Sequence, residues 1–95
     1  YGAGKAALLH FTRSMAAEFA SRGIRVNALA PGPVDTDMVR NTGPESTAGM
    51  ARSNYLKRLA DPDEMVGAVL YMASDAASFM TGQCLTVDGG MVPAR

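Results

Sequence analysis

Two short β-like runs, each ending at glycine, constrain the fold of this chain more than any other feature. The first is Ile24–Ala30, followed by Pro31-Gly32, and the second is Gln83–Asp88, followed by Gly89-Gly90. The segments before and between them carry helical patterns, and strands joined by a helical crossover pair in parallel. Parallel sheets are covered on both faces and use more than two strands. We therefore predict an α/β fold of two strands and three or four helices, which residues 1–95 do not complete as a domain.

Two stretches predict well-defined helices. The first runs from Tyr1 to about Ser21, with Gly23 as its C-terminal cap. Its apolar stripe is formed by residues at spacings of three and four, namely Leu8, Phe11, Met15 and Phe19. The second begins at the capping box Asp61–Glu64, has Pro62 at its first helical position and continues to about Ala73. A further short helix, capped by Ser74-Asp75, is predicted to reach Phe79.

Between these helices, residues 37–60 show weak patterning and many turn-forming residues. A long irregular segment in a compact domain is often a functional lid, although it can also be a disordered surface loop. We favour the lid for residues 37–60. Met38 and Met50 lie within it and could line a substrate pocket.

The composition limits the classes of function. Nine basic and nine acidic residues give zero net charge, which argues against a nucleic-acid binder and removes any electrostatic attraction to membranes. No apolar run approaches the ~20 residues that a membrane span requires. The one cysteine, Cys84, can form neither an internal disulfide nor a metal cluster, and we interpret it as a buried, inert thiol. A soluble, cytoplasmic protein without a metal site is the expectation.

The first five residues suggest proton chemistry. Tyr1 and Lys5 are four apart on a predicted helix and therefore share a face. A nearby cation favours the phenolate and lowers the tyrosine pKa from about 10, so that the phenol can exchange a proton near neutral pH. The alternative is a surface tyrosine beside a solvated lysine. Because a catalytic pair at the start of a chain is unusual, we expect these residues to belong to the back part of a longer enzyme.

Five blocks of sequence together resemble the C-terminal part of the short-chain dehydrogenase/reductase family. In chain order they are Tyr1-x-x-x-Lys5, Arg25-Val26-Asn27, Pro31-Gly32-x-Val34-x-Thr36, Thr81-Gly82-Gln83 and Val87-Asp88-Gly89-Gly90. The resemblance covers nearly the whole chain and implies part of one NAD(P)-binding domain with a Rossmann-type, doubly wound parallel sheet. It further implies hydride transfer between NAD or NADP and a small carbonyl or secondary alcohol substrate.

The resemblance assigns roles residue by residue. Tyr1 would be the general acid or base, and Lys5 would tune it and bind the nicotinamide ribose. Pro31-Gly32 would end the strand under the nicotinamide, while the Val34 backbone and the Thr36 hydroxyl would hold its carboxamide. The family's glycine-rich phosphate loop and its catalytic Ser and Asn precede the Tyr and are absent from these residues. By itself, the chain is therefore expected to bind no dinucleotide and to be inactive.

The sequence also suggests a substrate class, an assembly state and the roles of three further residues. The resemblance is closest to the 3-oxoacyl-carrier-protein reductase branch, where Arg22 would face the acidic carrier, although sugar and polyol dehydrogenases look similar here. It also implies a homo-oligomer, a tetramer or a dimer. The alternative to an enzyme is a non-catalytic, cofactor-sensing or oligomer-forming subunit. We interpret Asn27 as structural, Thr36 as a cofactor ligand that can also cap a helix, and His10 as exposed or at a subunit contact.

Overall fold

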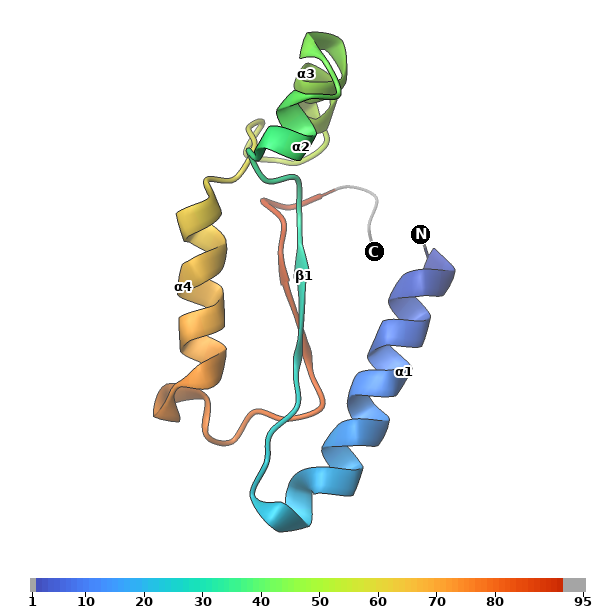
Figure 1. The fold of residues 1–95 in the computed structure, drawn as a ribbon, viewed down its shortest axis with the longest axis vertical. Coiled ribbons are helices and arrows are strands. Elements are labelled where there is room, and N and C mark those ends of the chain that lie inside the picture. Colours follow the sequence, from blue (N-terminus) through green and yellow to red (C-terminus); the bar gives the residue numbers. More distant parts are fainter. Residues whose placement is uncertain (1, 92–95) are drawn as a thin grey trace. The chain divides into compact units, whose positions relative to one another are not determined.

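A computed structural model describes residues 2–91, which contain four α-helices, two short 3-10 helices and two strands (Figure 1). In chain order they are α1 (Gly2–Phe19), η1 (Ala20–Arg22), β1 (Ala28–Pro31), α2 (Asp37–Arg40), α3 (Pro44–Arg52), α4 (Pro62–Ala73), η2 (Asp75–Ala77) and β2 (Cys84–Val87). Contacts divide them into two compact units: residues up to 29 with residues 69–85, and residues 30–68 with those from 86 onward.

The two strands form a parallel pair, as the sequence predicts. The Ala28 amide donates to the Gln83 carbonyl over 2.8 Å, and the Gly32 amide donates to the Val87 carbonyl over 2.9 Å. Both bonds join residues at the same separation in sequence, which is the pattern of parallel strands. β1 begins four residues later than predicted, because the Ile24 amide bonds back to Phe19 and residues 25–27 bond to the turn before β2 instead of extending the strand.

That turn explains why arginine and asparagine occur in the Arg25-Val26-Asn27 block. The Asn27 side chain donates to the Met80 carbonyl over 2.9 Å and accepts the Gln83 amide over 3.0 Å. The Arg25 guanidinium donates to the carbonyls of Met80, Met72 and Ser74 at 3.1, 2.8 and 3.3 Å. Unpaired carbonyls at a helix end need donors, and Arg25 supplies them at the end of α4. The structural interpretation of Asn27 is confirmed.

The long first helix forms largely as expected. α1 ends at Phe19, η1 follows, and Gly23 caps the end with φ +74° while its amide bonds to the Ala20 carbonyl. The predicted apolar stripe is not a buried face, however: Leu8 and Phe11 are exposed, whereas Thr12 and Ala16 are the buried residues of α1. α1 makes a close contact at Ala16, because the Ala16 Cβ lies 3.5 Å from the position that a Cβ would occupy on Gly82.

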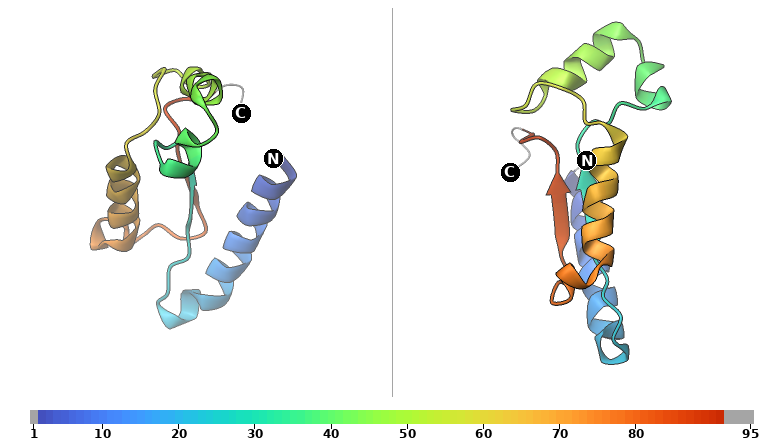
Figure 2. Two further views of the ribbon diagram at one scale, coloured as in Figure 1. Left: turned by 45° about the horizontal axis from the view of Figure 1, so that its top comes forward. Right: turned by 90° about the vertical axis from the view of Figure 1, so that its left-hand side faces the viewer.

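The prediction that residues 37–60 are irregular was wrong, because α2 and α3 lie within them (Figure 2). Thr36 caps α2, and its hydroxyl accepts the Val39 amide over 3.3 Å. Pro44 opens α3, and Gly43 precedes it with φ +102°. The turn-forming residues Gly43 and Pro44 therefore serve as the cap and the first residue of α3.

The N-terminus of α4 has the predicted capping box. The Asp61 side chain accepts the Asp63 amide over 2.9 Å, and the Glu64 side chain accepts the Asp61 amide over 2.8 Å. Both Glu64 oxygens also accept from the Arg58 guanidinium, at 2.7 and 2.9 Å. The predicted helix over 74–79 is only the turn η2, and the Ser74 hydroxyl donates to the Tyr71 carbonyl instead of capping it.

The described residues bury little apolar surface. The buried apolar residues are all alanines (Ala16, Ala28 and Ala77), whereas Phe11, Leu70 and Phe79 are exposed. Leu, Ile and Phe are normally among the most buried residue types. Apolar side chains on α1 and α4 thus have no cover within residues 2–91, as expected of a parallel sheet represented by two strands.

The bond network around Glu64 generates a prediction. Mainly the Arg58 guanidinium, and secondarily the Asp61 amide, lower the pKa of Glu64 from 4.5 to about 2. Because the folded-state pKa lies below the unfolded one, the stabilisation is complete above about pH 4.5 and is lost as the pH falls through about 2. An NMR titration of the Glu64 carboxyl carbon is expected to show a midpoint near 2. A midpoint near 4.5, unchanged by Arg58→Gln, would show that the pair does not form.

Candidate functional site

The predicted proton-transfer pair is only partly visible. Lys5 lies in the first turns of α1 and is half-buried. Tyr1 lies outside the described residues, so its alignment with Lys5 remains a prediction. The small residues Gly2 and Gly4 are exposed, and a Cβ built on either would meet nothing within 4 Å. The surface beside Lys5 on α1 is therefore open.

The other predicted site residues follow β1. Pro31 is the last residue of the strand and Gly32 extends the pairing to Val87. A Cβ on Gly32 would lie 2.8 Å from the Asp88 Cα and 3.0 Å from its Cβ, closer than real side chains approach. The glycine is thus required by close contact with the end of β2. This requirement stands whether or not a ligand approaches Gly32.

Val34 lies in an isolated parallel bridge with Ala60. The Asp35 amide donates to the Ala60 carbonyl and the Ala60 amide donates to the Pro33 carbonyl, both over 2.9 Å. In such a bridge the central residue directs its own N–H and C=O away from the partner. Within residues 2–91, neither the N–H nor the C=O of Val34 has a hydrogen-bond partner. One donor and one acceptor are therefore available, side by side, at the carboxyl end of β1.

Thr36 is the cap of α2, as its alternative interpretation predicts, and its hydroxyl still has a proton to donate. The exposed carboxylates of Asp35 and Asp37 both pair with Arg40. These ion pairs hold the first turn of α2 to the loop that follows β1. The two aspartates therefore serve as ion-pair partners of Arg40 in this structure.

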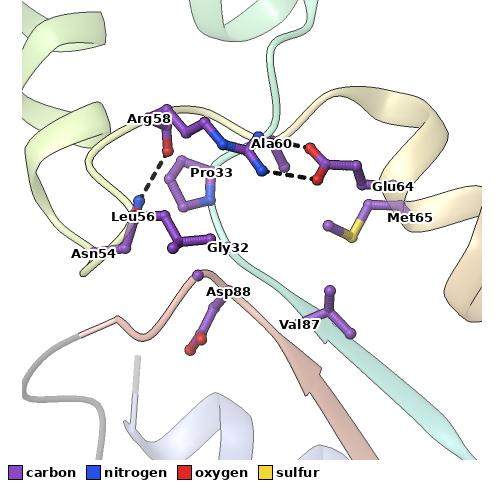
Figure 3. A pocket seen from close by; sticks show the side chains of 11 residues that line it. Gly32, Pro33, Asn54, Leu56, Arg58, Ala60, Glu64, Met65, Val87 and Asp88 are labelled. Carbon is purple, nitrogen blue, oxygen red and sulfur yellow. Dashed lines mark hydrogen bonds and ion pairs between the residues drawn. The ribbon is translucent and has the colours of Figure 1, made fainter.

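A cavity of about 90 Å³ lies beside this loop, within the second unit (Figure 3). Strand-end residues Gly32, Pro33, Val87 and Asp88 line one part of it, and Asn54, Leu56, Arg58 and Met65 are among the residues that line the rest. Figure 3 shows the Arg58 guanidinium facing Glu64 beside Pro33 and Ala60, with the Asp88 carboxylate directed elsewhere. The cavity wall is predominantly apolar.

Asn54 is the buried polar residue at this cavity. Its side chain is 3% exposed, and its amide nitrogen donates to the Arg58 carbonyl over 3.0 Å. Its carbonyl oxygen has no partner among the described residues and lies 3.0 Å from a Cβ built on Gly89. The neighbouring Tyr55 and Leu56 amides donate to the carbonyls of Gly90 and Gly89. The Tyr55 and Leu56 amides therefore fix this part of the 37–60 segment to the turn after β2, and the Asn54 side chain connects it to Arg58.

Sequence reasoning missed Asn54, Arg58 and the pairing of Arg58 with Glu64. No periodicity distinguishes Asn54 from the turn formers around it. Arg58 and Glu64 are six residues apart across Pro62, a spacing that matches neither a helical nor a strand face. The capping box was the available signal, and it identified Glu64 only as a helix cap.

The remaining expectations concern single residues. His10 is exposed, as predicted, and Cys84 is half-buried instead of fully buried. Met38 is exposed and Met50 half-buried. The Arg22 guanidinium lies 5.6 Å from the centre of the Phe19 ring. Residues 2–91 contain no cluster of three potential metal-ligating side chains, and none of their helices could cross a membrane.

Comparisons with known proteins agree on one family. A family profile described as enoyl-(acyl carrier protein) reductase matches residues 1–92. A 3-oxoacyl-(acyl-carrier-protein) reductase of Salmonella typhimurium is 46% identical over 91 residues, which are 96% of this chain and 37% of that protein. Cis-4-hydroxycyclohexanecarboxylate dehydrogenase of Sinomonas cyclohexanicum is 48% identical over 90 residues, 95% of this chain and 36% of that protein. The chain thus spans little more than a third of these relatives.

Solved structures support the same conclusion. A 3-oxoacyl-(acyl-carrier protein) reductase from Brucella melitensis superposes with a TM-score of 0.89 at 40% identity, over 99% of this chain and 35% of that one. A structure titled as a short-chain dehydrogenase/reductase family protein has a TM-score of 0.79 at 48% identity, over 95% of this chain and 36% of that one. The predicted Rossmann-type α/β fold is confirmed. With the profile matching residues 1–92, the chain belongs to the short-chain dehydrogenase/reductase family.

Proposed function

We propose that this chain is the C-terminal part of an NAD(P)-dependent oxidoreductase that interconverts a carbonyl and a secondary alcohol. Family membership and relatives named as a reductase and a dehydrogenase support the reaction class. The observation that carries the proposal is the backbone of Val34. Its N–H and C=O are unpaired within residues 2–91, and they lie at the carboxyl end of a parallel strand, where such folds bind ligands.

These groups fit a nicotinamide. A carboxamide is both a donor and an acceptor, so it matches the Val34 backbone pair, and the Thr36 hydroxyl can add one donated bond. Pro31, the last residue of β1, and Gly32, which has no side chain, would then lie under the nicotinamide. The bound cofactor would supply or accept the hydride. The chain's contribution is to hold the ring in one orientation, so that a single face meets the substrate.

Proton transfer is assigned to Tyr1 and Lys5. The Tyr1 phenol donates its proton to the carbonyl oxygen during reduction and accepts the hydroxyl proton during oxidation. The ammonium of Lys5, four residues later in the sequence, stabilises the phenolate that reduction leaves behind. It also binds the ribose hydroxyls. The alternative, a non-catalytic subunit, leaves this pair without a role in turnover.

Replacing Tyr1 by Phe in the full-length protein tests the catalytic role of Tyr1 against the non-catalytic alternative. The phenol oxygen is lost while the ring is kept, so we expect kcat to fall by at least about a hundredfold, the usual contribution of a positioned acid or base. Affinity for NAD(P) should change little. Steady-state kinetics in both directions, with His10→Gln as a surface control, provides the measurement. Turnover equal to that of the unmodified protein would contradict the catalytic role of Tyr1, whereas no NAD(P)-dependent turnover in the unmodified protein would favour the non-catalytic subunit.

The substrate class we favour is the 3-oxoacyl thioester. The Salmonella and Brucella relatives carry that name, and Arg22, the residue that we assign to an acidic carrier, is exposed at the end of η1. The relative named for a hydroxycyclohexanecarboxylate is equally similar, so a panel of thioesters and cyclic alcohols is required. Selectivity for cyclic alcohols would contradict the thioester as substrate, but it would still agree with the hydride-transfer proposal.

We also propose a cytoplasmic homo-oligomer, a tetramer or a dimer. The apolar side chains that residues 2–91 leave exposed on α1 and α4 include Leu8, Phe11, Val66 and Leu70. The sheet strands that residues 2–91 lack would cover part of this surface, and apolar surface that remains exposed beyond them is typical of protein interfaces. Light scattering coupled to size exclusion should give twice or four times the subunit mass for the full-length protein, whereas a monomer at micromolar concentration would contradict the proposal.

A further inference from the structure

We propose that Arg58 and Glu64 are positioning residues for the loop Pro33–Thr36, and that they act through the backbone of Ala60. This inference rests on the proposed function, in which Val34 and Thr36 hold the nicotinamide carboxamide. Neither Arg58 nor Glu64 needs to contact the cofactor. Their role is to fix the geometry of the strand-like bridge that presents Val34.

The loop depends on Ala60 for its shape. The Ala60 amide and carbonyl make the two 2.9 Å bonds to Pro33 and Asp35, one on either side of Val34. No other backbone hydrogen bond within residues 2–91 reaches residues 33–35. The direction of the Val34 N–H and C=O therefore follows the position of Ala60.

Ala60 is in turn enclosed by a ring of hydrogen bonds. Arg58, two residues before it, makes a two-bond contact with Glu64, and Glu64 accepts the amide of Asp61, the residue after it. The same guanidinium donates to the Leu59 carbonyl over 3.2 Å. Side chains thus close residues 58–61 into a cycle, which restrains the backbone on both sides of Ala60. Figure 3 shows the pair directly beside Pro33 and Ala60.

The cycle is anchored to buried structure by Asn54. Its side chain, 3% exposed, donates to the Arg58 carbonyl over 3.0 Å. The backbone of residues 58–60 is consequently held from the Asn54 side and from the Glu64 side. The low pKa of Glu64, about 2, keeps its carboxylate charged throughout the range in which such enzymes are assayed.

The ion pair is solvent-exposed, with side chains 51% and 43% accessible, so it should contribute little to overall stability. Its loss should appear mainly as poorer cofactor geometry. For Arg58→Gln in the full-length protein we expect KM for NAD(P) to rise about fivefold, the upper range for an exposed pair. We expect kcat to stay within about twofold and substrate KM to be unchanged. Arg52→Gln, the same change at an exposed arginine of α3, is the matched control.

Four further variants test the assignment of Arg58 and Glu64 more sharply. Glu64→Gln keeps an oxygen that accepts the Asp61 amide and should have a smaller effect than Glu64→Ala. Arg58→Lys keeps the charge without the two-bond geometry and should be intermediate. The double variant Arg58→Gln/Glu64→Gln should be no worse than Arg58→Gln alone, because both act through one pair.

Hydrogen exchange of the Asp35 amide, measured without cofactor, separates this inference from the proposed function. Its bond to Ala60 should open more readily in Arg58→Gln than in Arg52→Gln. Equal exchange in the two variants, or equal KM for NAD(P), would overturn the inference. So would a parallel rise of cofactor and substrate KM with a lowered melting temperature, which indicates general destabilisation. A full-length protein that lacks NAD(P)-dependent turnover would instead count against the proposed function, while faster Asp35 exchange would still support the bracing of the loop.

Discussion

The parallel pairing of β1 with β2 brings the two strand ends to one edge, and the candidate site depends on that pairing. Because Gly32 has no side chain, the backbone can pass within van der Waals contact of Asp88 and extend the hydrogen bonding to Val87. The chain after Gly32 then meets Ala60 and the chain after Val87 meets Asn54 and Tyr55. Any side chain at Gly32 would separate these segments. A glycine at the end of a strand can thus determine a site without contacting a ligand.

Much of the fold could be predicted from the sequence because the controlling interactions are local. The α4 capping box involves residues three apart, and the glycine cap after η1 is a single-residue property. The strand limits were less predictable. Residues 24–27 have β-forming character, but Arg25 and Asn27 bond to a turn more than fifty residues later. The local sequence around residues 24–27 does not indicate that this turn is their bonding partner.

The segment 37–60 shows the opposite error, since its turn-forming residues are also helix-starting residues. Thr36 and Pro44 stand where helices begin, and their neighbours fill the connections between them. Asn54 and Arg58 could not be predicted as part of the site, because their importance arises from burial and from a contact across Pro62. The residues that we propose to hold the nicotinamide were predicted by family resemblance. The role of the Arg58–Glu64 pair could be inferred only from the hydrogen bonds of the structure.

The central claim is that the backbone of Val34 binds the nicotinamide carboxamide. Hydrogen exchange of individual amides in the full-length protein tests it most directly, with the amide of buried Ala77, bonded to the Ser74 carbonyl, as the internal reference. Exchange at Val34 should slow markedly when NAD(P) saturates the protein, while exchange at Ala77 changes far less. Identical exchange at Val34 with and without saturating cofactor would contradict the account.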